Sequence, residues 1–373
     1  MMAQNATAKN HSGRRSLFGA AHLKLLERLC AACAVSGDEG EVRAIVLEQL
    51  QEYVLAKKGD VKVDALGNVL VNLPGNSTAN GARLRVMLAA HMDEVGFMIT
   101  HAEEDGIYRF ETVGSVDLRQ IVGKPVWIGR QHLPGVIGAK PIHLTRKDEI
   151  KSLIALDTLR IDTGLGKTKV QVGDRATFAT PFMRLGSSLL GKALDNRLGV
   201  LTLIELVKIA PANIDLLAAF TVQEEIGGRG ARVAAYNFNP DMAIAVDSTP
   251  AYDLPVWDDT ENAVFNTRLG HGPAIYLADP GTLSDPRLVR HLAQSAEAAG
   301  IPFQFRQPGG GGTDAGAIHL QRAGIPSVSL SVPSRYQHTA ASICRISDWQ
   351  DTLALLKVAL ANLTPALLAG ERA

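Results

Sequence analysis

The apolar run at residues 86–90, Val-Met-Leu-Ala-Ala, restricts the fold of this chain more than any other segment. Apolar and polar side chains do not alternate along it, as they do in a strand with one face in water, so both faces of this strand should be buried. Strands of that kind are typical of parallel sheets. We expect the strand to begin at Leu84 and the core to form around it.

Helical and strand-like segments alternate along most of the chain, and this alternation predicts an α/β fold. Apolar residues at helical spacing predict a helix over 23–35, and Ser36-Gly37-Asp38-Glu39 has the pattern of a capping box for a second helix that ends near residue 56. A turn at Gly67-Asn68 indicates a hairpin of 61–64 with 69–73. Further strands are expected at 215–222, 242–246, 302–305 and 327–331, and further helices at 197–210, 286–299, 313–323 and 348–368.

The segment 95–179 differs from the rest, with short β-type runs, many Gly, Pro and Val residues and no convincing helical pattern. We interpret it as a small β-rich domain inserted into the α/β domain, which then comprises residues 19–94 and 180–373. Residues 1–18 are rich in Asn, Ser, Lys and Arg and are expected to form a flexible tail without the apolar stretch of a secretory signal.

Charge and cysteine content narrow the possible functions. Lys plus Arg equals Asp plus Glu at 38 each, so the chain has no basic field for nucleic acid or for an anionic membrane. Three cysteines are an odd and sparse set, which favours a reducing compartment over a disulfide framework. No run reaches the roughly 18 apolar residues of a membrane span. The sequence therefore predicts a cytoplasmic protein that binds neither nucleic acid nor membrane.

Possible metal ligands follow the predicted strands at the point where each strand ends. They are His91 and Asp93 after the first buried strand, Glu224 and Glu225 after 215–222, Asp247 after 242–246, and His338 beyond 327–331. Carboxyl ends of parallel strands form the crevice in which open α/β sheets bind ligands, so these side chains should converge. Asp195 heads the helix predicted at 197–210 and can reach the same crevice.

These residue types suit a metal site with two ions. Imidazole and carboxylate groups bind zinc, cobalt or manganese, and a mixed set holds two ions when one carboxylate bridges them. Asp93 can accept the second ring N–H of His91, and one of Glu224 and Glu225 can bind metal while the other takes a proton from water. Each residue alone also has an ordinary interpretation, such as a helix N-cap for Asp195.

Blocks of sequence around these residues resemble, in order and spacing, the M42 family of metallo-aminopeptidases, from about Leu23 to the end of the chain. The blocks are 89–97 (AAHMDEVGF), 191–197 (GKALDNR), 221–227 (TVQEEIG), 245–247 (AVD), 310–316 (GGGTDAG) and 333–338 (PSRYQH). One departure is the Thr339-Ala340-Ala341 segment, where many relatives have serine followed by proline.

The resemblance implies a mixed-sheet catalytic domain sandwiched by helices, with the inserted segment as a barrel-like dimerisation domain. Subunits would form dimers that assemble into a tetrahedral dodecamer. The resemblance also implies two divalent metal ions per subunit, zinc or else cobalt or manganese, and a cis peptide between Asp195 and Asn196. It further implies that His91 and Asp247 complete one metal site and that Glu225 and His338 complete the other. Asp195 would bridge the two sites. Asp93 would orient His91, and Glu224 would be the general base.

The resulting hypothesis is a hydrolase that removes the N-terminal residue from peptides, with a metal-bridged hydroxide as the nucleophile. One alternative keeps both metals but assigns small N-acyl substrates, which would make the protein a deacylase or amidase. Another alternative is a catalytically silent protein that acts in assembly or binding.

Two further motifs lie outside this hypothesis. Cys30-Ala31-Ala32-Cys33 has the spacing of a redox or zinc motif, but it closes an apolar helix and has no second ligand pair, so we interpret it as buried helix packing. The glycine run at 309–312 lacks the Gly-Lys-Ser/Thr ending of a P-loop and is better explained as a flexible wall beside the substrate.

Overall fold

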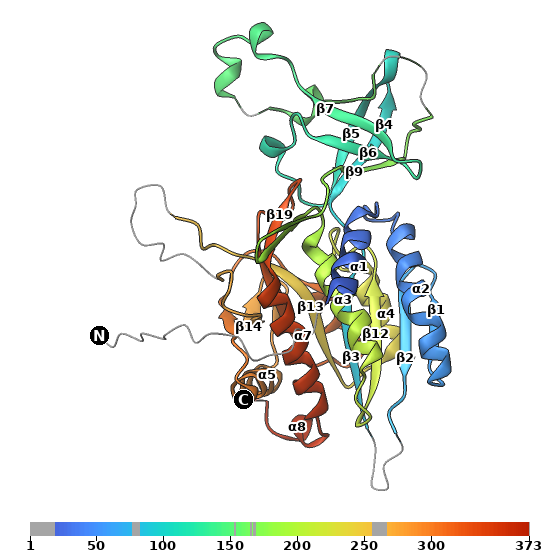
Figure 1. Cartoon of the computed structure of the whole chain (residues 1–373), viewed down its shortest axis with the longest axis vertical. Helices are drawn as coiled ribbons and strands as arrows, with labels where there is room; N and C mark the ends of the chain where they lie inside the picture. The colour runs from blue at the N-terminus through green and yellow to red at the C-terminus, as the bar shows by residue number, and fades with distance from the viewer. Residues whose placement is uncertain are drawn as a thin grey trace, which may run out of the picture.

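The computed structural model describes residues 19–76, 83–152, 154–164, 166, 169–255 and 267–372. The tail predicted at 1–18 lies outside the described residues. Figure 1 shows a large sheet with helices packed against it and a small barrel at the top of the view. This architecture confirms an α/β fold with a mixed sheet and an inserted barrel-like unit.

The large sheet has 11 strands, and its main path runs in the order β1, β2, β12, β3, β13, β18, β19, β11, β10. Its strands are β1 (Asp60–Val63), β2 (Val69–Leu73), β3 (Leu84–His91), β10 (Met183–Leu185), β11 (Ser188–Gly191), β12 (Ile214–Thr221), β13 (Met242–Pro250), β14 (Ala274–Tyr276), β17 (Gln304–Arg306), β18 (Ser327–Arg335) and β19 (Ser342–Arg345). The four central strands β12, β3, β13 and β18 are parallel, and antiparallel strands flank them. A separate hairpin joins β15 (Ala278–Asp279) to β16 (Thr282–Leu283).

The parallel register brings the ends of the central strands to one edge of the sheet. Thr221 at the end of β12 pairs with His91 at the end of β3, and Asp247 of β13 pairs with Ser331 of β18. Residues that follow these positions in sequence therefore lie close together, because the carboxyl ends of parallel strands meet at one edge of the sheet.

Helices cover both faces of the sheet. They are α1 (Ala20–Ala31), α2 (Gly40–Ala56), α3 (Leu194–Lys208), α4 (Arg229–Phe238), α5 (Pro286–Ala299), α6 (Asp314–Ile318), α7 (Ile346–Ala361) and α8 (Ala366–Ala369). Val86 and Leu88 of β3 belong to the core beneath α1, α2, α3, α5 and α7, whereas Met87 and Ala89 pack with α4 and α6. Both faces of β3 are thus buried, as predicted. Within the described part of the chain, none of the helices combines the length and apolar character needed to cross a bilayer.

The barrel is closed and follows the strand order β4, β5, β8, β7, β6, β9. Its strands are β4 (Gly96–Ala102), β5 (Ile107–Val113), β6 (Pro125–Ile128), β7 (Leu133–Gly138), β8 (Arg160–Asp162) and β9 (Arg175–Phe178). Short 3-10 turns connect them, namely η1 (Glu104–Gly106), η2 (Leu118–Gln120), η3 (Ile142–Leu144), η4 (Glu149–Lys151) and η5 (Leu156–Thr158). Phe97 packs edge to face against Phe110 and Phe178, with ring centroids 5.2 and 5.3 Å away, and gives the barrel its own core.

Several predicted helix ends are wrong, and the structure gives the reason for each. The first helix stops at Ala31 because the chain turns to pair Val35 with Glu94. The capping box at Ser36 does not form, since the Ser36 hydroxyl donates to the Asp93 carboxylate at 2.6 Å instead.

Three predictions about helices in the C-terminal half also need correction, and strands β10, β11, β14 and β19 were not predicted. The helix predicted at 313–323 ends at Ile318, the one predicted at 348–368 is divided into α7 and α8 by residues 362–365, and α4 was not predicted. Glycines at 227, 228 and 230 give the start of α4 the composition of a loop, which explains the omission.

Candidate metal centre

A cavity of about 910 Å³ opens at the carboxyl edge of the central strands. Six of the predicted site residues line it: His91, Asp195, Glu224, Glu225, Asp247 and His338. Tyr252, Tyr276 and the glycines at 310–312 form other parts of its wall. The cavity therefore brings together residues that lie almost 250 positions apart in sequence, as His91 and His338 do.

Asp195 reaches the cavity because α3 lies very close to β13. The Asn196 side chain donates a hydrogen bond to the Val246 carbonyl at 2.8 Å, and a Cβ atom at Gly199 would lie only 2.6 Å from the same oxygen. Glycine at 199 therefore permits the contact. The Asp195-Asn196 peptide is cis, which confirms the geometry that the resemblance implied.

Residues with left-handed backbone cluster around the cavity. Ala193, Gln223 and His338 have φ values of 53°, 57° and 56°. This region is unfavourable for residues other than glycine, and such conformations persist where the surrounding structure holds them for a function. The backbone next to Asp195, next to Glu224 and at His338 itself is thus held in a set conformation.

Asp195 lies between two imidazoles. Its Oδ1 is 3.2 Å from Nε2 of His91, and its Oδ2 is 3.7 Å from Nε2 of His338. Nε2 of His91 also lies 3.4 Å from Oδ1 of Asp247 and 3.9 Å from Oε2 of Glu224. Beyond His338, Nε2 lies 3.2 Å from Oε2 of Glu225. The centre therefore has two halves that share Asp195.

The donor atoms fit divalent cations. His91, Asp195 and Glu225 each offer a ligand atom, and these atoms lie within 4.8 Å of one another. Oδ1 of Asp195 is buried and makes no hydrogen bond of good geometry among the described residues, although Nε2 of His91 lies 3.2 Å away, so this oxygen is available to bind a cation. Imidazole nitrogens and carboxylate oxygens without thiolate suit zinc, cobalt or manganese.

The crowding of acids raises the pKa of several carboxyl groups. Burial raises the pKa of Glu225 to about 8, with repulsion from Asp195 added and His338 opposing. Burial likewise raises the pKa of Asp247 to about 6 and that of Glu224 well above its usual value, while His91 opposes both shifts. The raised pKa values mean that these buried acids resist ionisation, and a bound cation would stabilise their ionised forms.

The histidines respond in the opposite direction. Burial lowers the pKa of His338, but the Asp195 and Glu225 carboxylates outweigh it and raise the pKa to about 9. Burial also works against charge on His91, yet Asp247 and Asp195 raise its pKa well above the usual value. Both shifts mean that the field at the centre favours positive charge, as a cation would require.

Asp93 lies behind the centre, is fully buried and connects its parts. Its backbone carbonyl and its Oδ1 lie 3.2 and 3.5 Å from Nδ1 of His91. The carboxylate also accepts hydrogen bonds from the backbone N–H groups of Glu224 (3.0 Å) and Glu225 (3.1 Å), and from the Ser36 hydroxyl (2.6 Å). One side chain thus contacts both His91 and the loop that carries both glutamates.

Sequence reasoning assigned no role to Asp314, which is buried near this centre. Its Oδ2 accepts a hydrogen bond from the Thr221 hydroxyl at 2.5 Å, while its Oδ1 has no partner within the described part of the chain. Burial raises the pKa of Asp314 to about 7, with the charge of His91 opposing. In sequence, an acid directly after Thr313 is indistinguishable from an ordinary first-turn acid of a helix.

A buried ionic network beneath the centre also escaped prediction. The Glu94 carboxylate accepts hydrogen bonds from Nζ of Lys192 at 2.8 Å and from Nη2 of Arg197 at 2.9 Å. Arg197 also donates to the Met92 carbonyl. The network ties the loop after β3 to the start of α3, and hence His91 to Asp195.

Comparison with known proteins decides the family. Residues 67–355 match the family model described as M42 glutamyl aminopeptidase. The chain belongs to the M42 family. This M42 aminopeptidase is a hydrolase of peptides, and the family is metal-dependent.

Named relatives cover nearly all of this M42 aminopeptidase. The glutamyl aminopeptidase of Lactococcus lactis is 31% identical over 349 residues, which cover 88% of this chain and 93% of the relative. An aminopeptidase from the archaeon Desulfurococcus kamchatkensis has a similar structure, with a TM-score of 0.85, 32% identity and coverage of 93% and 96%. The Pyrococcus horikoshii TET1 peptidase, which can assemble into a tetrahedron or a large octahedral shell, has a TM-score of 0.79, 31% identity and coverage of 92% and 100%.

Proposed function

We propose that this M42 member removes the N-terminal residue from peptides with two divalent ions per subunit, zinc or else cobalt or manganese. The observation that carries the proposal is the position of Asp195, whose Oδ1 lies near His91 and whose Oδ2 lies near His338. A carboxylate with one oxygen toward each of two imidazoles has the arrangement of a bridging ligand.

The ligand sets follow from the shorter contacts. His91 and Asp247 would hold one ion, Glu225 and His338 the other, and Asp195 would bind both. Supporting this division, each histidine lies within 3.4 Å of one terminal carboxylate oxygen. When bound, the two cations would polarise the scissile carbonyl and lower the pKa of water from about 15.7 toward about 7.

Glu224 is the proposed general base. Its carboxylate lies at the edge of the centre, with Oε2 3.9 Å from Nε2 of His91, and it lines the same cavity. A carboxylate with a raised pKa accepts a proton from water more readily, and the resulting acid can return that proton to the leaving amine nitrogen. The backbone N–H of Glu224 donates a hydrogen bond to the Asp93 carboxylate, which would hold Glu224 in position.

The inserted segment 95–179 is proposed as the dimerisation domain of a homo-oligomer, built from dimers that assemble into a dodecamer. Large apolar side chains on the loop after β7 are strongly exposed, with fractions of 69% at Ile142, 61% at Leu144 and 54% at Ile150. Such a group of side chains marks an interaction surface. The assembly of the Pyrococcus horikoshii relative supports the same proposal.

The proposed location is the cytoplasm. Cys30, Cys33 and Cys344 are free thiols, and free thiols suit a reducing compartment.

The decisive experiment couples metal analysis of the purified protein to a panel of aminoacyl chromogenic substrates, with and without chelator. We expect two ions per subunit, hydrolysis of substrates with a free α-amino group, loss of that activity in chelator and its return with zinc, cobalt or manganese. Matched substrates with a blocked amine test the alternative, because cleavage of these alone would identify a deacylase. Full activity in metal-free protein would refute the proposal.

A further inference from the structure

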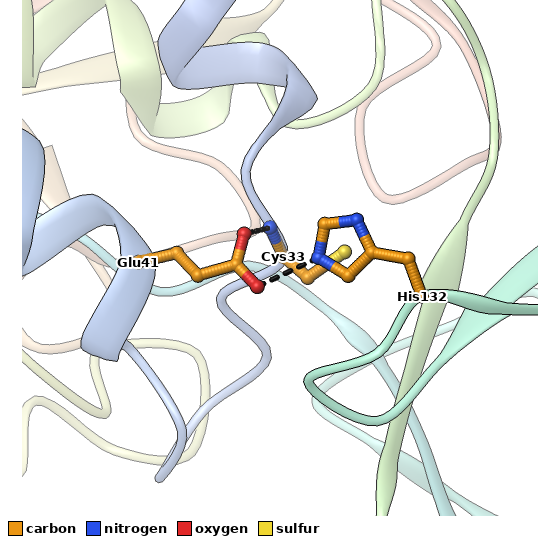
Figure 2. A group of neighbouring side chains, drawn as sticks. All are labelled: Cys33, Glu41 and His132. Atoms are coloured by element: carbon orange, nitrogen blue, oxygen red, sulfur yellow. Dashed lines mark hydrogen bonds and ion pairs between the residues drawn. The ribbon is translucent and has the colours of Figure 1, made fainter.

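A second group of potential metal ligands lies away from the catalytic cavity, where the barrel meets the α/β domain. We name it the junction cluster: Cys33, Glu41 and His132, whose ligand atoms all lie within 4.8 Å of one another. Figure 2 shows the three side chains turned toward one another from separate segments of the chain. Cys33 follows α1, Glu41 lies in the first turn of α2, and His132 lies between β6 and β7 of the barrel.

Hydrogen bonds and a ring contact hold the three residues in this arrangement. Oε2 of Glu41 accepts a hydrogen bond from the backbone N–H of Cys33 at 3.0 Å, and its Oε1 lies 2.7 Å from Nε2 of His132. The His132 ring stacks on Trp127, with centroids 6.5 Å apart, and its backbone has a φ of 50°. The left-handed backbone at His132 belongs to the tight turn between β6 and β7, where its N–H donates to the Gly129 carbonyl at 3.0 Å.

We propose that the junction cluster binds a zinc-type divalent cation through the Cys33 thiolate, the Glu41 carboxylate and the His132 imidazole, and so fastens the barrel to the α/β domain. Sulfur, nitrogen and oxygen donors of these types are those that zinc selects, and three protein ligands leave a fourth position for water. The His132 and Glu41 side chains are 38% and 35% exposed, which leaves a path for the ion to enter.

The protonation of Cys33 argues against a redox role. Burial raises the pKa of the Cys33 thiol to about 12, so the free thiol keeps its proton at neutral pH. On binding, the cation replaces that proton, which passes to solvent. Cys30, the other half of the Cys-x-x-Cys pattern, is 1% exposed in the main core. Helix packing is therefore correct for Cys30 and wrong for Cys33.

The thiolate provides a signal that separates the junction cluster from the catalytic centre, whose proposed ligands are only nitrogen and oxygen atoms. Chelator-treated protein would be titrated with Co²⁺, and the near-ultraviolet thiolate-to-cobalt charge-transfer band would be recorded. We expect the band in the unaltered protein and in Cys30→Ala, a matched control that removes a neighbouring thiol. We expect no band in Cys33→Ser. Cobalt uptake without the band in the unaltered protein would overturn the proposal.

A second measurement examines the other two ligands without relying on cobalt. The rate of iodoacetamide labelling of Cys33 would be followed by peptide mass spectrometry, with and without added Zn²⁺. Zinc should slow the labelling at least several-fold in the unaltered protein and leave it unchanged in Glu41→Gln and His132→Ala. Equal rates with and without zinc in the unaltered protein would contradict the proposal and show that the cluster is only a hydrogen-bonded contact between the domains. Neither readout depends on peptidase activity, so failure here leaves the proposed function intact.

Discussion

The two halves of the candidate metal centre are built in different ways. His91 and Asp247 are parts of neighbouring central strands, and their side chains are only 2% and 6% exposed. Glu225 and His338 come from loops, and the His338 side chain is 36% exposed. The strand half is therefore fixed by the packed core, whereas the loop half depends on individual contacts that hold His338 and the 4% exposed Glu225 side chain in place.

The loop half also depends on the barrel segment. Nδ1 of His338 lies 3.0 Å from the carbonyl of Ser115, a residue that follows β5. This contact sets the direction in which Nε2 faces Asp195 and Glu225. We expect the ion of the strand half to bind more tightly than the ion of the loop half, and the predictions below test that difference.

The largest effect is expected for Asp195→Asn, because Asp195 belongs to both halves. Loss of a ligand shared by both ions should cost several kcal/mol of transition-state stabilisation, a fall in kcat/KM of roughly 10³-fold or more. Metal analysis should find both ions weakened. Asp215→Asn is a matched control, since Asp215 pairs with Arg83 at the other end of β12. A variant that keeps one ion at full occupancy would show that Asp195 belongs to one half alone.

The next prediction separates the halves. His91→Ala should lose the ion of the strand half and also destabilise the protein, because it leaves Asp247 buried without its partner; removing one member of a buried pair costs about 3–5 kcal/mol. His338→Ala should lose the ion of the loop half with little change in melting temperature, since its side chain is partly exposed. Ion stoichiometry and calorimetry of the two variants give the comparison. Equal destabilisation would remove the distinction between a core half and a loop half.

Residues of both halves could be predicted from the sequence. A buried parallel strand can be recognised from residues 86–90, and the rule that ligands gather at strand ends then gives His91, Asp93 and the glutamates after β12. Asp247 was expected after a strand and instead lies within β13, which extends to Pro250. The predicted position of Asp247 is still correct, because the pairing register brings it to the same carboxyl edge of the sheet.

Other features could not be predicted because their signals lie in three-dimensional contacts. Ser36 has the sequence pattern of a helix cap, yet its hydroxyl bonds Asp93. Asp314 and the Glu94 network are ordinary acids and bases in sequence, and only the folded chain brings them beneath the centre. His132 acquires a possible function only when the barrel meets α2. Local patterns do not encode such long-range pairs.

Asp93 joins the two halves, so its replacement tests whether they act as one unit. In Asp93→Asn the amide cannot accept hydrogen bonds through both of its terminal atoms, and one contact to the Glu224 and Glu225 backbone is lost. We expect activity or metal affinity to fall about 10–100-fold, the usual cost of changing a partner of metal ligands. Ser36→Ala should cost less, because it removes only the hydroxyl contact. An Asp93→Asn variant with unchanged metal affinity and activity would contradict a positioning role.

The smallest expected effect is a pH dependence of the metal-free protein. Glu225 and Asp247 have pKa values of about 8 and about 6 in the folded chain, above their ordinary values of 4.5 and 3.8, mainly through burial. The folded chain therefore holds protons that the unfolded chain has lost, so stability should fall as pH rises from about 4 to about 8. His338 acts in the same direction: its pKa of about 9, against an ordinary 6.5, means that its stabilising charge is lost as pH rises through that range.

Thermal unfolding in chelator at about pH 5.5 and at about pH 9 measures this slope, with a lower melting temperature expected at the higher pH. Glu225→Gln should flatten the slope between pH 6 and pH 8, whereas Asp247→Asn should act mainly below pH 6, because each variant removes one titration. Bound ions should reverse the trend, since metal ligands must be deprotonated and metal affinity therefore rises with pH. The gap in melting temperature between loaded and metal-free protein should thus widen toward high pH. Equal stability of the metal-free protein at the two pH values would mean that the acids of the centre ionise at their ordinary pKa values, and that the crowding of charge in the two halves is relieved without cations.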